Sequence, residues 1–199
     1  MTDHVVDLGF VSQHFEAGAH MCLIYKDDEE REKIISQYLL SGLRDQEKVT
    51  YFAYKTGREE IMNLLENSGI VVNSENFEVA DATDSYCPHH YFDPDEMLES
   101  LKELYNNTIK MGYKNCRLSG EMQWALDPIP GTNRLMEYEA MVNNVVKTHP
   151  VTSICQYDAR LFDGEVIVDC LKVHPYVIVN GQVVENPYYL TPEEFLKHK

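Results

Sequence analysis

The sequence predicts an α/β fold in three layers, with helices on both sides of a mostly parallel β-sheet and a β-hairpin near the C-terminus. Short apolar segments of strand length alternate with longer segments whose apolar residues recur at helical spacing, about five times along the chain. The dipeptide Asn180-Gly181 then separates two short apolar runs, as in a hairpin with a two-residue turn. Since no repeat or linker interrupts this pattern, we expect residues 1–199 to form a single domain.

The chain begins with two strand–helix pairs. Residues 20–25, His-Met-Cys-Leu-Ile-Tyr, are a compact apolar run, and the acidic residues 27–30 suit the positive end of a helix dipole. Apolar residues at positions 34–43 recur at helical spacing and predict the first helix. Residues 49–54 are β-branched and aromatic, which is typical of a strand, and a second helix is expected over residues 57–69, ending at its glycine.

The middle of the chain adds two strands and two helices. A strand is expected at residues 77–82, and an irregular loop at 84–94 follows it. Residues 95–112 carry apolar side chains on one helical face, and the short apolar run 116–119 predicts the next strand. Residues 132–147 show a clear helical stripe, which predicts another helix against the sheet.

The C-terminal part completes the sheet. Residues 151–157 predict a strand, residues 164–173 a helix, and residues 176–179 and 182–184 the two strands of the hairpin. In open, mostly parallel sheets, ligands bind beyond the carboxyl ends of the strands. Candidate functional residues are therefore expected where strands end.

Composition and charge exclude several classes of protein. The chain has 17 lysine and arginine residues against 33 aspartate and glutamate residues, a formal charge of −16 that repels phosphate backbones. No apolar run reaches the roughly 20 residues of a membrane helix, and the N-terminus does not resemble a secretory signal. Five scattered cysteines form no CxxC pair and are expected to be reduced thiols. We therefore expect a cytoplasmic protein without direct nucleic-acid or membrane contact.

The turn after the first predicted strand argues against nucleotide hydrolysis. Residues 24–28 contain no glycine, and neither GxxxxGK[ST] nor GxGxxG occurs in the chain. Asp27 and Asp28 would also repel phosphate at the start of the helix. The sequence therefore lacks the loop that holds phosphate in P-loop proteins.

Soft and polar side chains cluster at the predicted strands. His20 and Cys22 are two apart and share one strand face, where they could hold a metal ion or simply fill the sheet face. Glu121 follows a strand beside Trp124, the chain's one tryptophan, and could be a base, a hydrogen-bond acceptor or a helix-end charge. His174 precedes proline, as at a helix C-terminus.

Two further segments are candidate sites. Cys155, Gln156 and Tyr157 end another predicted strand, and we expect this group to meet the pairs 20/22 and 121/124 in a common pocket. The loop segment 87–90, Cys-Pro-His-His, has the composition of metal ligands, although adjacent loop histidines are mostly solvated. No Ser-His-Asp order, nucleophile elbow or HExxH motif supports hydrolysis.

Seven segments, taken in order, resemble one protein family, the MEDS family or methanogen/methylotroph DcmR-type sensory domain. They span the chain from about residue 10 to 196, and the resemblance predicts a stand-alone sensory domain. The matching segments are residues 18–30, 49–54, 91–98, 117–126, 137–144, 154–158 and 174–189.

The resemblance implies a RecA/KaiC-like core without a phosphate loop, and a domain that senses small hydrocarbon derivatives such as methanol, methylated amines or sulfides, or halomethanes. The family's HxC, GExxW, CQY and HP motifs are present in this sequence. The ligand-binding residues that they imply are His20, Cys22, Glu121, Trp124, Cys155, Gln156, Tyr157 and His174. Tyr25, at the end of the first predicted strand, is a further ligand-binding candidate.

The leading hypothesis is a non-catalytic sensor of small C1 or hydrocarbon derivatives in signal transduction or transcriptional regulation. Its partners would be a small organic ligand and a signalling protein, and the chain could form a homo-oligomer. One alternative is a thiol-dependent methyl-transfer enzyme with Glu121 as base and Cys155 as nucleophile. Another is a degenerate nucleotide-binding scaffold that acts through oligomerisation. The sequence identifies no cofactor, apart from a metal ion that His20 and Cys22 could hold.

Overall fold

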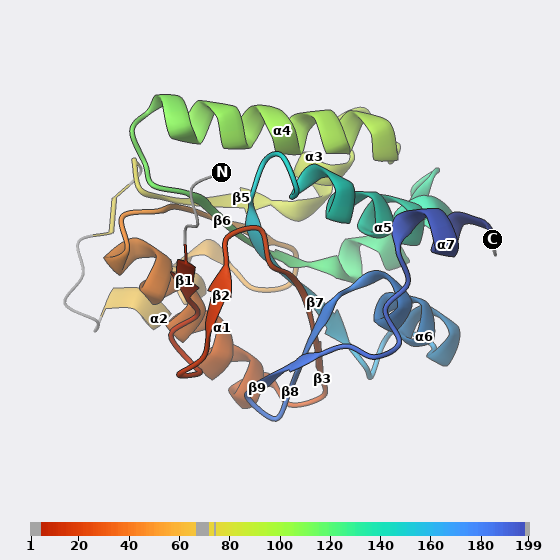
Figure 1. Ribbon diagram of the computed structural model, residues 1–199, viewed down its shortest axis with the longest axis horizontal. Helices are drawn as coiled ribbons and strands as arrows, with labels where there is room; N and C mark the ends of the chain where they lie inside the picture. Colours follow the sequence, from red (N-terminus) through yellow and green to blue (C-terminus); the bar gives the residue numbers. More distant parts are fainter. Residues whose placement is uncertain (1–4, 67–71, 74, 198–199) are drawn as a thin grey trace.

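The computed structural model describes residues 5–66, 72–73 and 75–197, within which seven strands form one sheet in the order β5-β4-β6-β7-β3-β8-β9 (Figure 1). A separate two-stranded sheet pairs β1 (Val5–Asp7) with β2 (His14–Glu16). The strands of the large sheet are β3 (His20–Tyr25), β4 (Lys48–Ala53), β5 (Phe77–Asp81), β6 (Cys116–Glu121), β7 (Thr152–Asp158), β8 (Tyr176–Val179) and β9 (Gln182–Glu185).

The pairing of the strands confirms the predicted α/β class. Neighbouring strands from β5 to β8 are parallel, and β9 pairs antiparallel with β8. The turn between β8 and β9 has φ of 49° at Asn180 and 69° at Gly181. A two-residue hairpin turn of this kind requires positive φ at both positions, which asparagine and glycine tolerate best.

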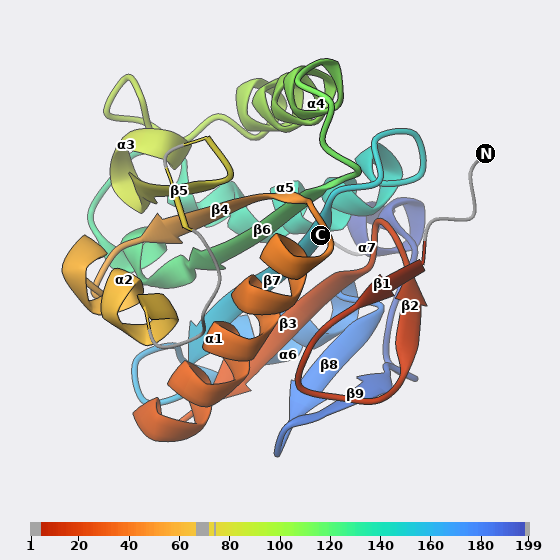
Figure 2. The same ribbon diagram turned by 90° about the vertical axis from the view of Figure 1, so that its left-hand side faces the viewer.

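Helices cover both faces of the sheet, as Figure 2 shows for α1 and α2 on one side and α4 and α5 on the other. Each face has its own apolar core, one built with α1 and the other with α4, α5 and α6. The helices are α1 (Asp28–Arg44), α2 (Arg58–Glu66), α3 (Ala82–Tyr86), α4 (Pro94–Lys110), α5 (Leu135–Val145), α6 (Gly164–Val173) and α7 (Pro192–Lys197), with 3₁₀ segments η1 (Met122–Leu126) and η2 (Thr132–Arg134).

Aspartate N-caps fix where three of the long helices begin. The side chain of Asp27 accepts a hydrogen bond from the Glu30 amide at the start of α1, Asp93 caps α4, and Asp163 caps α6. Such caps satisfy amide groups that the first helical turn leaves without partners. The Asp27 carboxylate thus lies at the N-terminus of α1, the position where P-loop proteins hold phosphate.

Several short elements differ from the expectation. The β1–β2 pair, α3 and α7 were not expected, since segments of three to six residues show too little periodicity to identify. The helix expected from residue 132 begins with the 3₁₀ segment η2, and α5 follows from residue 135. The described part of α2 ends at Glu66, so its expected stop at Gly69 lies outside the described residues. Within the described part of the chain, no helix combines the length and apolar character needed to cross a membrane.

Candidate functional site

The two faces of the sheet separate the predicted site residues. Side chains along a strand alternate between faces, so Cys155 and Tyr157 of β7 face α5, whereas Gln156 between them faces α1. Gly120 pairs with Cys155, and Glu121 pairs with Gln156. The expected common pocket is therefore wrong: the residues divide into two sites on opposite faces.

The first site is a buried group of four side chains, His20, Glu139, Cys155 and His174, which we name the histidine–glutamate cluster. They come from the start of β3, the middle of α5, the middle of β7 and the end of α6. Three of them are at most 1% exposed, and Cys155 is 8% exposed. A side-chain group this deep is shielded from bulk water, so its polar contacts are strong.

One carboxylate oxygen is the meeting point of the cluster. Glu139 Oε2 lies 3.0 Å from His20 Nε2 and 3.4 Å from His174 Nε2. Cys155 Sγ lies 3.5 Å from the same oxygen and 3.6 Å from His20 Nε2. Four potential ligand atoms thus surround one small volume.

Partners outside the cluster fix how both imidazole rings are protonated. Asn143 Nδ2 donates to the carbonyls of Val173 and Ala140, so its Oδ1 is the atom that faces His20 Nδ1, at 3.1 Å. His174 Nδ1 donates to the Cys170 carbonyl at 2.8 Å. Both rings therefore carry a hydrogen on Nδ1, and both turn Nε2 toward the carboxylate.

Burial and the nearby charges set the ionisation of the cluster. Burial opposes the charged form of Glu139, but its close contacts with His174 and His20 hold its pKa well below the usual range. Burial also opposes a charged His174, yet the Cys22 thiol and the Glu139 carboxylate raise its pKa to about 9. Burial and the charge of His174 lower the pKa of His20. At neutral pH the cluster thus contains one carboxylate and one imidazolium.

Cys22 belongs to a neighbouring group of potential ligands, which does not include His20. Its thiol donates to the Tyr176 carbonyl at 3.8 Å, and ligand atoms of Cys22, Cys170 and His174 all lie within 4.8 Å of one another. A hydrogen bond from Cys170 lowers the pKa of Cys22, whereas burial raises that of Cys170 well above its ordinary value. The expected metal pair His20 and Cys22 is thus split between two groups that share His174.

A small cavity borders the histidine–glutamate cluster between the sheet and helices α4 and α5. Its volume is about 20 Å³, and His20, Glu139 and Cys155 line it together with aromatic and aliphatic side chains. Gly120 also lines it, and a Cβ built on this glycine would lie 3.0 Å from the Tyr86 hydroxyl. The cavity is therefore partly polar and partly apolar.

Trp124 stands behind the cavity wall. Its ring stacks on Tyr86 at 4.7 Å between centroids and contacts Phe92 at 5.1 Å. The side chain is fully buried, and its Nε1 has no hydrogen-bond partner among the described residues. Trp124 thus supports an aromatic wall of the cavity.

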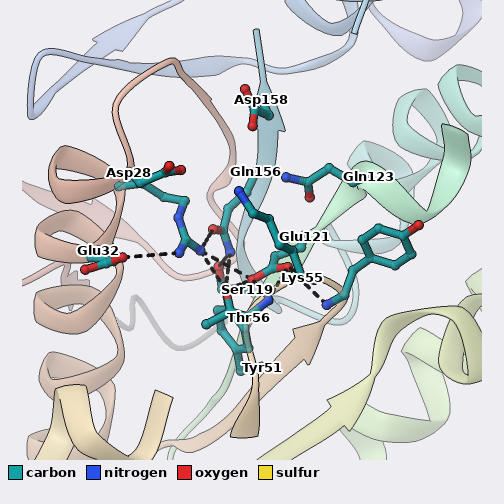
Figure 3. A network of polar contacts seen from close by, with 12 residues as sticks. Asp28, Glu32, Tyr51, Lys55, Thr56, Ser119, Glu121, Gln123, Gln156 and Asp158 are labelled. Atoms are coloured by element: carbon teal, nitrogen blue, oxygen red, sulfur yellow. Dashed lines mark hydrogen bonds and ion pairs between the residues drawn. The ribbon is translucent and has the colours of Figure 1, made fainter. Parts of the chain in front are cut away.

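The second site lies at the carboxyl end of the sheet, where Arg31, Tyr51, Ser119, Glu121 and Gln156 form what we name the strand-end network (Figure 3). Tyr51 donates its hydroxyl to Glu121 Oε1 at 2.6 Å, and Arg31 Nη1 lies 3.3 Å from the same atom. Gln156 accepts from Arg31 at 3.3 Å and donates to Ser119 at 2.9 Å. Every member of the network has a polar partner.

Backbone amides complete the surroundings of Glu121. Its Oε2 accepts from the amides of Tyr54, Lys55 and Thr56, at 3.1, 2.5 and 3.1 Å. Burial opposes its charged form, but hydrogen bonds from Thr56 and Tyr51 lower its pKa. An open cavity of about 180 Å³ adjoins this network. Glu121 thus occupies the hydrogen-bond donors that an anionic ligand would otherwise need.

Tyr25 lies at the rim of the same cavity. Its hydroxyl accepts from Gln123 Nε2 at 2.7 Å, and burial raises its pKa to about 12. Nearby, Arg160 bridges Asp28 and Asp158, both at 2.7 Å. The strand-end region is thus built from internal ion pairs and hydrogen bonds.

The segment 87–90 does not form a metal site among the described residues. His89 is 60% exposed at its side chain and pairs with Glu96 at 3.2 Å, while Cys87 is buried. The groups of close metal-ligating side chains in the described part of the chain do not include this segment. The interpretation of its histidines as solvated fits this geometry.

Several residues that organise the two sites were not predicted from the sequence. Glu139 and Asn143 lie four apart on the buried face of α5, and Arg31 lies on the buried face of α1. Residues four apart share a helix face, so polar residues within the apolar stripes carried the missing signal. Cys170, one turn before His174, was also not selected.

Comparisons with known proteins agree with this fold and these motifs. Residues 19–175 match the family MEDS, described as the MEthanogen/methylotroph, DcmR Sensory domain. The transcriptional repressor DcmR of Methylorubrum extorquens is 30% identical over 156 residues, which cover 78% of this chain and 57% of the repressor. The chain thus spans somewhat more than half of that relative.

Solved structures show the same fold at low sequence identity. A KaiC-like protein from Pyrococcus horikoshii OT3 has a TM-score of 0.58 at 15% identity, covering 87% of this chain and 80% of its own. An uncharacterized protein from Pyrococcus horikoshii, solved with an unknown peptide, has a TM-score of 0.60 at 13% identity, with 90% and 91% coverage. These similarities establish a KaiC-like fold. The family match and the DcmR relative show that the chain belongs to the MEDS family of sensory domains.

Proposed function

We propose that this chain is the ligand-sensing module of a regulatory protein, and that its ligand is a C1 compound or simple hydrocarbon derivative such as methanol or a methylated amine or sulfide. The observation that carries the proposal is the cavity of about 20 Å³ beside the histidine–glutamate cluster. The family's sensory character and the DcmR relative, a transcriptional repressor, support the regulatory part.

The size of the cavity favours a very small ligand. A single water needs about 10–15 Å³ of such space, so a cavity of about 20 Å³ accepts one or two non-hydrogen atoms unless its walls move. Ligands this small gain at most about 1.5 kcal/mol per non-hydrogen atom, which corresponds to millimolar binding or weaker. A weak, small-molecule signal therefore suits this site.

The walls of the cavity suit a ligand with one polar and one methyl group. His20, Glu139 and Cys155 offer hydrogen-bonding atoms on one side, and Tyr86 and Leu101 offer apolar surface on the other. The polar residues come from β3, α5 and β7, so a bound ligand changes contacts between three elements at once. A shift of α5 relative to the sheet is then the response that a partner reads.

The methyl-transfer alternative receives less support. Burial and the Glu139 carboxylate raise the pKa of Cys155 well above its ordinary value, which keeps the thiol protonated and weakly nucleophilic. Glu121, the base in that scheme, lies on the other face of the sheet among its own donors. The two groups therefore do not face a common substrate position.

The scaffold alternative rests on the KaiC-like fold alone. The phosphate position at the start of α1 is capped by Asp27, and the first turn carries Asp28, Glu29 and Glu30. We also propose a homo-oligomer, a cytoplasmic location and a signalling partner. The charge of −16 favours a basic face on that partner. A stable ring that forms without any small ligand would favour the scaffold.

A cavity-filling variant tests the proposal. We expect millimolar methanol or methylamine to raise the melting temperature of the wild-type chain, since a ligand that binds only the folded state stabilises it. Gly120→Ala should remove this response, because the new methyl group enters the cavity beside the Tyr86 hydroxyl. Gly57→Ala is the matched control, because a Cβ there meets no atom within 4 Å. Equal responses of both variants, or no response of the wild type to any of these compounds, would contradict the proposal.

A further inference from the structure

We infer that the histidine–glutamate cluster binds one divalent transition-metal ion of the Zn²⁺ type, with His20 Nε2, His174 Nε2, Glu139 Oε2 and Cys155 Sγ as ligands. This site goes beyond the proposed function, because it does not depend on which organic ligand the cavity accepts. Two imidazoles, one carboxylate and one thiolate are a donor set that zinc-type ions favour.

The distances between the four atoms match a tetrahedral site. Metal–nitrogen and metal–oxygen bonds of about 2.0–2.2 Å and metal–sulfur bonds of about 2.3 Å place neighbouring donor atoms roughly 3.3–3.6 Å apart. The observed separations are 3.0, 3.4, 3.5 and 3.6 Å, and all four atoms lie within 4.8 Å of one another. The ligands therefore need only small shifts to close around an ion.

The orientation of the rings leaves acceptor atoms facing each other. Both imidazoles carry hydrogen on Nδ1, because Asn143 Oδ1 and the Cys170 carbonyl are acceptors. The lone pair of His20 Nε2 therefore meets another acceptor, Glu139 Oε2, at 3.0 Å, and His174 Nε2 approaches the same oxygen at 3.4 Å. A single proton can join two of these atoms along one line, whereas a metal ion satisfies all of them together with the sulfur.

An outer layer of hydrogen bonds supports each ligand. Asn143 orients His20, the Cys170 carbonyl orients His174, and the Tyr157 hydroxyl donates to Glu139 Oε1 at 2.8 Å. Metal-binding histidines and carboxylates are held by partners of this kind. The arrangement of the ligands is thus set before an ion arrives.

The charges balance when the ion binds. Cys155 loses its proton to water, the electron pair of the broken S–H bond forms the metal–sulfur bond, and any proton on His174 Nε2 leaves to water as well. A 2+ ion with one carboxylate and one thiolate then has no net charge, which a site buried this deeply requires. No oxidant or reductant takes part.

The neighbouring group of Cys22, Cys170 and His174 is a weaker candidate. His174 directs its Nδ1 hydrogen toward Cys170, so no lone pair of the ring faces that side. The thiol of Cys22 donates to the Tyr176 carbonyl. This group therefore offers two thiols, while the four-residue cluster offers a full tetrahedral set.

The experiment loads the metal-free full chain with Co²⁺ alone, and with Zn²⁺ in competition. We expect native mass spectrometry to find one ion per chain, and absorption spectra to show the intense d–d bands of tetrahedral cobalt together with a thiolate-to-cobalt charge-transfer band. Zinc should displace cobalt and abolish both signals. If the folded wild-type chain takes up no stoichiometric cobalt or zinc, the inference is wrong.

Variants assign the ligands. Cys155→Ser should lose the charge-transfer band, whereas Cys116→Ser, which changes another buried free cysteine, should keep it. Tyr157→Phe keeps the ring and removes only the hydrogen bond to Glu139, so it should weaken cobalt binding by about 10- to 100-fold while circular dichroism remains that of the wild type. Loss of the band in Cys22→Ser but not in Cys155→Ser would overturn the assignment in favour of the neighbouring group.

Melting temperatures separate this inference from the proposed function. The response to methanol and methylamine is measured on the metal-free chain and on the zinc-loaded chain. A response without any metal uptake contradicts the metal site and leaves the sensor proposal standing. Metal uptake with no response in either form supports the metal site and contradicts the sensor proposal.

Discussion

The two buried carboxylates of this protein, Glu121 and Glu139, lie on opposite faces of one sheet and have opposite surroundings. Glu121 is surrounded by donors: the Tyr51 hydroxyl, the Arg31 guanidinium and three backbone amides. Glu139 has one hydroxyl donor, and its other oxygen faces two ring nitrogens and a thiol. A buried carboxylate can therefore either be fully satisfied by donors of the protein, as Glu121 is, or keep an oxygen directed at potential ligand atoms, as Glu139 does.

The largest effect is expected from removing the saturated carboxylate. Glu121→Ala leaves the Arg31 charge and three amides buried without their partner, which should lower the free energy of unfolding by about 3–5 kcal/mol. Urea denaturation followed by circular dichroism measures this change. Glu99→Gln, which removes an exposed pair with Lys102, is the control and should cost less than about 1 kcal/mol. If Glu121→Ala lowers the free energy of unfolding no more than the control does, Glu121 does not stabilise the fold as its buried donors suggest.

A smaller loss of stability but a larger loss of binding is expected at the other carboxylate. Glu139→Gln keeps the size of the side chain and an acceptor for Tyr157, so the free energy of unfolding should fall by only about 1–3 kcal/mol. Cobalt uptake and the response to C1 compounds should disappear. Glu121→Gln is the matched variant and should retain both, provided that it folds. The reverse pattern, with binding lost only in Glu121→Gln, would exchange the roles of the two sites.

The smallest effect is expected from acid, because protonation removes only the charge of Glu121. Its pKa is below the ordinary value of 4.5, so the folded state favours the carboxylate. The resulting stability is present above pH about 4.5 and declines as the pH falls toward the lower, folded-state pKa. The groups that face this carboxyl are Arg31, Tyr51 and the amides of residues 54–56.

The difference in unfolding free energy between the wild type and Glu121→Gln, measured between pH 3 and 7, isolates this contribution from other carboxyl groups. We expect this difference to be larger at pH 7 than at pH 3. A difference that stays constant, or that grows in acid, would show that ionised Glu121 does not stabilise the fold. This measurement also distinguishes Glu121 from Glu139, whose Oε2 contacts ring nitrogens rather than backbone amides and a guanidinium.

Local patterns explain which parts of the fold could be predicted. The strand at residues 20–25 and the helix that follows were identified because apolar spacing and an acidic first turn act over a few neighbouring residues. The hairpin at Asn180-Gly181 was identified because its turn needs positive φ at those two positions. The 3₁₀ start before α5 has no comparable pattern, and the short β1–β2 pair was missed.

The candidate site could be predicted only in part. His20, Cys155, Tyr157 and His174 were expected from motifs and do meet on the α5 face of the sheet. Glu121, Gln156 and Tyr25 belong to the opposite, strand-end region, because one step along a strand moves a side chain to the other face. Their roles in ligand binding stay predictions.

The alternation of strands and helices, the hairpin and the lack of a phosphate loop can all be read from local sequence, because each depends on residues close together in the chain. Which polar groups meet depends instead on how the chain folds. Glu139 reaches His20 across 119 positions of sequence, through the parallel pairing of β3 with β7 and the packing of α5 on that sheet. Contacts at such separations depend on strand order and on which helix covers which face, and neither is encoded in the spacing of neighbouring residues.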